Sequence, residues 1–272
     1  MTRSRWAGRG LAALLAVASL VLLARAIAPW NPLFQETLSP RTILAIGTWG
    51  KFLYLVVGAV ASTRLVKSFE PGTPSRAAWR WLSSGLIVLL LGQACIAFYQ
   101  FGLGMDELPF PSVADVFFVV SYPLVIAALL MFLRAYASSG FPIGPRAERL
   151  WIGAGVAVFC ALVGYPILKP LVTAPGETLE TLLNVLYPVL DFLLLIPAVL
   201  LIRISLRFRG GAVWKVWATL LAGFVFLCAA DILFAYFSLF SWVELVDLVD
   251  AAYLLAYGLL GLGVLYQRDL LT

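Results

Sequence analysis

Eight apolar stretches, each about as long as a bilayer-crossing helix, divide this sequence and decide its architecture. They cover roughly residues 10–30, 43–66, 81–103, 113–134, 150–169, 181–202, 215–237 and 246–266. A transmembrane helix needs about 20 mostly apolar residues, and lipid offers no water to backbone groups that lack an internal partner. The pattern therefore predicts an all-α integral membrane protein with eight transmembrane helices.

The segments between these stretches carry the residues that are typical of loops. EPGTPSR, SSGFPIGPRAER and TAPGETLE are rich in proline, glycine and charge. The first apolar stretch follows a basic segment, as in a signal peptide, but it is too long and lacks a small-residue cleavage site before the next loop. We therefore interpret it as a helix and expect residues 1–272 to form a single membrane domain.

Composition excludes several classes of protein. Only 12% of the residues are charged and 62% are hydrophobic, so a soluble enzyme, a disordered chain and a coiled coil are excluded. There is no histidine, which removes His-based haem and zinc sites. Cys95, Cys160 and Cys228 lie far apart in apolar runs, where packing is the simpler role. We predict no metal, no cofactor and no nucleotide, since a Gly-rich phosphate loop is also missing.

Basic residues predict the orientation of the chain in the membrane. Of the 19 Lys and Arg residues, all but Arg25, Arg41, Lys51 and Lys169 fall on the side that holds the N-terminus. Lys and Arg accumulate on the cytoplasmic side of membrane proteins. We predict that both termini are cytoplasmic, in a bacterial inner (plasma) membrane. The formal charge of +5 then reflects contact with anionic lipid, and no nucleic-acid partner is expected.

Acidic residues show the opposite distribution. Of the 14 Asp and Glu residues, only Glu70, Glu148 and Asp269 fall on the predicted cytoplasmic side. The rest lie in outer loops or within helices, mostly toward the outer half. Because acids have little influence on membrane insertion, topology alone does not require this bias. It indicates a functional region of acidic character in the outer half.

The sequence also suggests an internal repeat. ADVFFVVSYPLVIAALL in the fourth apolar stretch aligns with VDAAYLLAYGLLGLGVL in the eighth, which places Asp115 over Asp250 and Tyr122 over Tyr257 at an offset of 135 residues. Four helices per unit would make the repeats parallel, at about 10–134 and 150–266. The alternative is that two apolar helices resemble each other by chance.

Polar side chains inside the predicted helices are the candidate functional residues. A charged group at the centre of the bilayer costs about 2.5–3.5 kcal/mol on insertion scales, so such residues face the protein interior. Spacings of three and seven place several of them on common helical faces. We expect them to converge on one polar cavity in the outer half. The candidates are Lys51, Tyr54, Gln93, Asp115, Tyr122, Asn184, Tyr187, Asp191, Asp231, Asp250 and Tyr257.

Depth in the membrane predicts the partner of Lys51. Lys51, Asp191 and Asp231 lie deepest, so we expect Lys51 to pair with one of these two aspartates. Asp115 and Asp250 lie closer to the outer interface and could instead cap helices or hold helices together. A simpler interpretation of Lys51 is that its side chain extends toward the outer interface.

One segment resembles a known family. Residues 109–130, PFPSVADVFFVVSYPLVIAALL, fit the pattern P-S-x-A-D-x-x-[FY]-x-x-x-Y-P-L. This pattern resembles a multi-pass bacterial membrane region that precedes GGDEF and EAL signalling domains. The matching residues are Pro111, Ser112, Ala114, Asp115, Phe118, Tyr122, Pro123 and Leu124. The resemblance implies a sensor, here expected to act without a GGDEF or EAL output domain.

Three functional hypotheses follow. The first is a non-enzymatic, receptor-like membrane module that binds a small ligand or partner in an acid-lined cavity and signals to a cytoplasmic protein. The second is a small proton- or cation-coupled transporter or a subunit of a membrane complex. The third is an intramembrane lipid-modifying enzyme, which the sequence supports poorly because it has no D-D-x-x-D run and no G-x-S-x-G motif.

Overall fold

The chain forms a bundle of long helices. The computed structural model describes residues 2–27, 39–105, 108–141, 144–173, 178–240 and 245–271. Within them, eight α-helices and two short helical turns occur and no strand is present. The helices are α1 (Thr2–Ile27), α2 (Pro40–Val66), α3 (Pro74–Ala97), α4 (Val113–Ser138), α5 (Arg146–Thr173), α6 (Thr178–Ser205), α7 (Ala212–Leu239) and α8 (Val246–Leu271).

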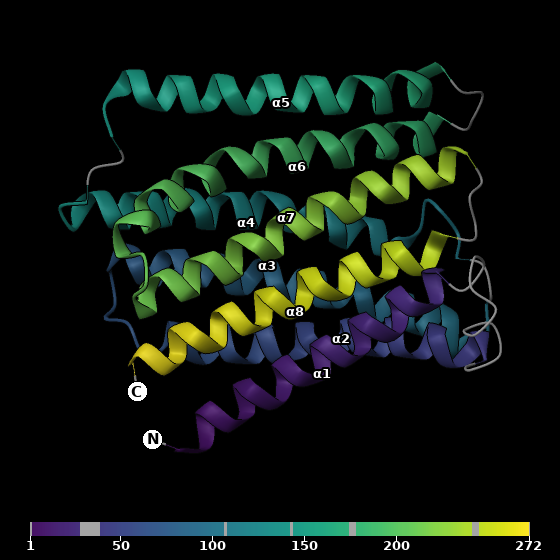
Figure 1. Cartoon of the computed structure of the whole chain (residues 1–272), viewed down its shortest axis with the longest axis horizontal. Coiled ribbons are helices and arrows are strands. Elements are labelled where there is room, and N and C mark those ends of the chain that lie inside the picture. Colours follow the sequence, from purple (N-terminus) through teal and green to yellow (C-terminus); the bar gives the residue numbers. More distant parts are fainter. Residues whose placement is uncertain are drawn as a thin grey trace.

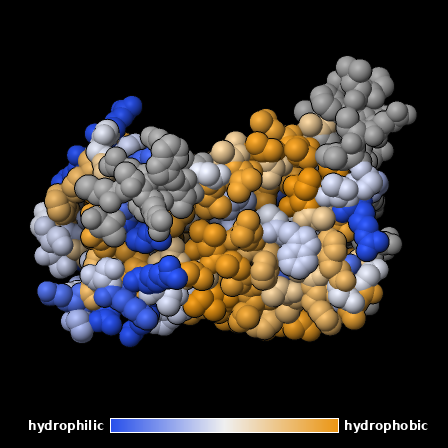
Figure 2. Space-filling model, turned by 90° about the horizontal axis from the view of Figure 1, so that it is seen from below, coloured by the Kyte–Doolittle hydropathy of each residue, from blue (hydrophilic) through white to orange (hydrophobic). Residues whose placement is uncertain are grey.

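The helices have the length and composition of membrane spans. Among the described residues, seven helices are long and apolar enough to cross a bilayer, and α1 contains a shorter apolar run, Gly10–Ala24. Figure 2 shows an apolar band across the middle of the molecule, with hydrophilic residues gathered toward the two ends. The prediction of an all-α, multi-pass membrane protein is therefore confirmed.

Local sequence explains where several helices begin. Ser39, Thr73 and Ser112 precede α2, α3 and α4, and each side chain accepts a hydrogen bond from a backbone amide of the first turn. Such caps satisfy amide groups that have no partner within the helix. Proline follows two of these caps, where its fixed φ suits a helix start. Loops rich in Ser, Thr and Pro thus set the helix boundaries at the bundle ends.

Six helices close into a ring, as their packing shows. α2 packs against α3, α3 against α4, α4 against α6, α6 against α7, α7 against α8, and α8 against α2. α1 lies outside the ring against α8 and α2, whereas α5 lies at the opposite edge against α6 and α7. Figure 1 shows α5 at the edge of the bundle and both chain termini at the same end. The ring contains helices from both halves of the chain.

The half of the ring near the termini is filled with aromatic side chains. Phe132 of α4 packs edge-to-face against Trp79 of α3 at 5.0 Å between ring centroids and against Trp217 of α7 at 4.9 Å. All three side chains are buried, and the indole N–H of Trp217 donates to the hydroxyl of Tyr136. Aromatic pairs of this kind contribute beyond their buried area. This end of the ring is therefore a solid core.

Glycines allow α2 and α8 to approach closely. A Cβ atom on Gly261 would lie 3.1 Å from the carbonyl oxygen of Tyr54, and one on Gly58 would lie 3.5 Å from the Cα atom of Gly261. Small residues at such crossings bring membrane helices into direct contact. The α2–α8 crossing joins the two halves of the chain and fixes which side chains of these helices meet.

Ring contacts are partly those expected of a repeat. Exchanging the halves would convert the α2–α8 contact into the α6–α4 contact, and both are present. The outer helices differ, because α1 packs across onto α8 of the other half while α5 packs onto α6 and α7 of its own half. The parallel repeat of residues 10–134 and 150–266 stays a prediction.

Candidate functional site

A cavity of about 660 Å³ lies within the half of the ring that is remote from the termini. Its wall comes from all six ring helices and from Leu108, Pro109, Phe110 and Ser112, which precede α4. Cavities of roughly 300–1,000 Å³ are typical of small-molecule sites. The ring thus holds a packed aromatic core near the termini and a cavity at the other end.

Nine of the eleven candidate residues line this cavity. They are Lys51, Gln93, Asp115, Tyr122, Asn184, Tyr187, Asp231, Asp250 and Tyr257. Tyr54 does not, because its hydroxyl donates to the carbonyl oxygen of Leu11 in α1 at 3.4 Å. Asp191 is fully buried behind Tyr122, outside the cavity wall. The expected convergence on one cavity is observed for the nine and is wrong for these two.

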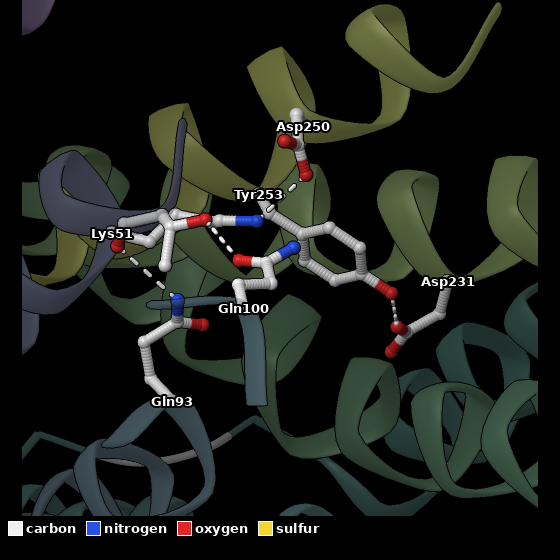
Figure 3. A network of polar contacts seen from close by, with 7 residues as sticks. Lys51, Gln93, Gln100, Asp231, Asp250 and Tyr253 are labelled. Carbon is white, nitrogen blue, oxygen red and sulfur yellow. Dashed lines mark hydrogen bonds and ion pairs between the residues drawn. The ribbon is translucent and has the colours of Figure 1, made fainter. Parts of the chain in front are cut away.

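Lys51 pairs with Asp250, so the prediction of Asp191 or Asp231 as its partner is wrong. The Lys51 Nζ atom lies 2.6 Å from Oδ1 of Asp250 and 5.8 Å from the centroid of the Tyr253 ring (Figure 3). Side chains lean toward the N-terminus of their helix, which for α2 is the cavity end. A Cβ atom on Gly47 would lie 2.6 Å from the Asp250 carboxylate, so this glycine leaves room for it. Lys51 therefore reaches outward to α8.

Tyr122 connects two aspartates from different helices. Its hydroxyl oxygen lies 2.8 Å from Oδ1 of Asp191 in α6 and 2.5 Å from Oδ2 of Asp231 in α7. A tyrosine hydroxyl has one proton to donate and can accept from a second partner. Two ionised carboxylates cannot both be satisfied by one proton. Both contacts of Tyr122 are hydrogen bonds at the same time only when one of the two carboxyl groups is protonated.

The surroundings of the two carboxyl groups identify the protonated one. Asp231 accepts a second hydrogen bond from the hydroxyl of Tyr253 (Figure 3), so both of its oxygens face donors. Asp191 is fully buried, and its Oδ2 atom has no hydrogen-bond partner among the described residues. An ionised carboxylate is costly in such a place. We infer that Asp191 is neutral and donates to Tyr122, which donates to Asp231.

Asp115 has both a capping and a bridging role. Its Oδ2 atom accepts from the backbone amide of Ser112 at 2.7 Å and from the Ser112 hydroxyl at 2.9 Å, which completes a capping box at the start of α4. The hydroxyl of Tyr187 in α6 donates to Oδ1 of Asp115 at 2.7 Å. The capping interpretation of Asp115 is confirmed, and the same carboxylate also ties α4 to α6.

Two glutamines, Gln93 of α3 and Gln100 of the turn that follows it, contact the same residue of α2. The Gln93 amide donates to the carbonyl oxygen of Thr48 at 3.2 Å, and the Thr48 hydroxyl donates to Gln100 at 2.5 Å. Gln100 lies in a π-helical turn, Phe98–Gly102, that follows α3. Such turns add a residue to the helix and often occur at functional sites. Both glutamines lie on the cavity wall.

Sequence reasoning missed Tyr253 as a member of the site. Tyr253 stands three residues after Asp250, where Phe118 stands three residues after Asp115, and both aromatic residues line the cavity. The repeated spacing was therefore an available signal. The apolar part of the wall was not predicted either, because Phe110, Phe234 and Phe237 resemble the other aromatic residues of a membrane helix.

Comparison of the chain with protein-family models, curated proteins and solved structures gives no significant match. The geometry and the chemistry of the cavity are therefore the basis on which a function can be assigned.

A double-mutant cycle tests the Lys51–Asp250 pair. Lys51→Met and Asp250→Asn should each destabilise the protein, since each leaves a partly buried charge without its partner. Their effects should couple by about 1–3 kcal/mol in thermal unfolding of the detergent-solubilised protein. Lys51→Met combined with Asp191→Asn is the matched control and should be additive within about 0.5 kcal/mol. Coupling to Asp191 with additivity toward Asp250 would contradict the pairing.

Tyr122 and Tyr257 form a matched pair for testing the bridge. Tyr122→Phe removes the hydroxyl between Asp191 and Asp231 and should cost about 1–3 kcal/mol, because buried carboxyl oxygens lose a partner. The Tyr257 hydroxyl has no hydrogen-bond partner among the described residues, so Tyr257→Phe should change the unfolding free energy by less than about 0.5 kcal/mol. Equal losses in the two variants would refute the bridge.

Proposed function

We propose that this chain is a receptor-like membrane module that binds a small ligand in the cavity. Ligand binding changes the arrangement of its helices. The observation that carries the proposal is the origin of the cavity wall. α2, α3 and α4 of the first half and α6, α7 and α8 of the second half all contribute residues. A ligand that touches both halves favours one arrangement of them over others, which is how binding shifts a conformational equilibrium.

Charge supports an orientation with the cavity outward. The predicted topology places most of the Lys and Arg residues on the same side of the membrane as the termini. The exceptions are Arg25, Arg41, Lys51 and Lys169. On the positive-inside rule the side that holds the termini is cytoplasmic, and the membrane would be the bacterial inner membrane. The cavity, at the other end, would then receive ligands from outside the cell.

The solid end of the ring supports reception rather than passage. Trp79, Phe132 and Trp217 fill the ring between the cavity and the end that carries the termini. A permeating ligand would have to displace this packed core, whereas a signal needs only a small shift of the helices that frame it. A cytoplasmic signalling protein that contacts this end would be the partner. The resemblance of residues 109–130 to sensor regions agrees with this proposal.

A proton-coupled carrier is the second candidate, and one observation favours it. Asp231 lies on the cavity wall, and Tyr122 connects it to Asp191, which lies deeper in the protein. Buried carboxyl groups joined by a hydroxyl are the elements of a proton relay in transporters. In a carrier, this relay would couple proton movement to alternating access of the cavity.

Access to the cavity separates the two candidates without knowledge of the ligand. Ile96 lines the cavity, so Ile96→Cys in a background without the three native cysteines introduces a reporter thiol there. A charged, membrane-impermeant thiol reagent is applied to right-side-out and inside-out vesicles. The receptor proposal predicts reaction only when the reagent is on the outer side. Gly140→Cys, in the turn after α4, is the control and should react only from the cytoplasmic side.

Each other outcome has a defined meaning. Reaction of Ile96→Cys from both sides would favour the carrier, because a carrier exposes its site alternately. Reaction of Ile96→Cys only from the cytoplasmic side would overturn the proposed orientation. If Ile96→Cys reacted only from the cytoplasmic side and Gly140→Cys only from the outer side, the bundle would be inverted in the membrane.

A further inference from the structure

The described wall of the cavity carries an excess of negative charge. Asp115, Asp231 and Asp250 line it together with a single basic residue, Lys51. Lys51 forms its ion pair with Asp250. Asp115 and Asp231 are held by hydroxyl and amide donors alone. In a site surrounded by protein and lipid, two carboxylates without a cation attract one strongly.

Lys51 shows which kind of cation the cavity accommodates. Its ammonium group lies between the Asp250 carboxylate and the face of the Tyr253 ring. A carboxylate beside an aromatic face is favourable for an ammonium ion, because the ring quadrupole adds to the ion pair. Tyr253 also donates to Asp231, so the same ring borders the carboxylate that has no cation (Figure 3).

Two polar side chains on the wall are available to a ligand. Residues Asn184 and Tyr257 are 7% and 4% exposed, and neither side chain makes a hydrogen bond to the described residues. Most polar groups inside folded proteins have a hydrogen-bond partner, and a molecule in the cavity can supply one here. A polar group on the ligand would satisfy them.

We propose that the ligand is an organic ammonium ion, with its cationic group beside Asp231 and a second polar group at Asn184 and Tyr257. The proposal rests on the proposed function, because it names the ligand class of the same cavity. A carboxylate accepts about four hydrogen bonds, and Asp231 accepts two from tyrosines. Asp231 therefore has capacity for the N–H groups of an ammonium ion.

The rest of the wall favours an organic cation over a metal ion. Phe110, Phe118, Phe234, Leu89 and Leu227 line the cavity and suit a hydrocarbon portion of the ligand. Among the described residues, no group of three His, Cys, Asp or Glu side chains is placed to hold a metal ion. Hard cations such as Ca²⁺ require six or more oxygen ligands at short distance. The aspartates are instead distributed around an apolar space.

A matched set of probes tests the ligand class. The full-length protein in lipid nanodiscs is titrated at pH 7 with phenethylammonium and hexylammonium, with the neutral 2-phenylethanol and hexanol, and with the anionic phenylacetate and hexanoate. Binding is measured by calorimetry and by the shift in the thermal unfolding midpoint. The proposal predicts that the ammonium ions bind and raise the midpoint, while the alcohols and carboxylates of the same size do not.

Variants locate the bound cation. Asp231→Asn should weaken ammonium binding roughly tenfold or more, because a hydrogen bond to a charged partner is lost. Tyr257→Phe and Asn184→Ala should weaken binding of the β-hydroxylated analogue, 2-amino-1-phenylethanol, several-fold more than they weaken binding of phenethylammonium. Glu148→Gln is the matched control at the other end of the bundle, where Glu148 pairs with Arg203 and lies outside the cavity wall. It should retain full ammonium binding.

The outcomes separate this proposal from the proposed function. Binding of the alcohols or carboxylates without the ammonium ions would overturn the ligand class and leave a ligand-binding cavity. Ammonium binding that survives Asp231→Asn unchanged would overturn the assigned position. Failure of every probe to bind would overturn the ligand class, whereas the proposed function is tested separately by the access of Ile96→Cys to the thiol reagent.

Discussion

The hydroxyl group of Tyr122 links three helices in the interior of this protein, and it has only one proton to donate. Tyr122 of α4 lies between Asp191 of α6 and Asp231 of α7, and it has one proton for two carboxyl groups. The chain of donors is complete only when one carboxyl group is neutral. The bridge holds three ring helices together at the floor of the cavity, below which the aromatic core begins. The hydrogen bonds between the cavity and the aromatic core therefore depend on the protonation state of Asp191 and Asp231.

The two halves of the chain meet at two ring crossings with a common chemistry. At the α2–α8 crossing, Asp250 accepts the ammonium group of Lys51. At the α4–α6 crossing, Asp115 accepts the hydroxyl of Tyr187. In each case an aspartate in the first turns of a helix pairs with a long side chain from the other half. Both contacts lie on the wall of the cavity.

Much of this arrangement could be predicted from the sequence, and the reasons for the exceptions are physical. Helix positions follow from the length of apolar runs, and polar side chains in lipid must turn inward, so nine candidates converge. Depth in the membrane alone could not predict the ion-pair partner of Lys51. The direction of its side chain and the contact between α2 and α8 determine that partner. Tyr54 shares a helical face with Lys51, yet its hydroxyl contacts α1. The hydrophobic periodicity of the sequence does not predict that α1 packs outside the ring.

Infrared spectroscopy of the carboxyl groups tests directly whether Asp191 is protonated. A protonated carboxylic acid absorbs at a C=O stretching frequency distinct from that of a carboxylate, and exchange into D₂O shifts this band. We expect such a band at neutral pH in the purified wild-type protein, its loss in Asp191→Asn and its persistence in Asp115→Asn. A spectrum without a protonated carboxyl band, or a band that survives Asp191→Asn unchanged, would contradict the shared proton between Asp191, Tyr122 and Asp231.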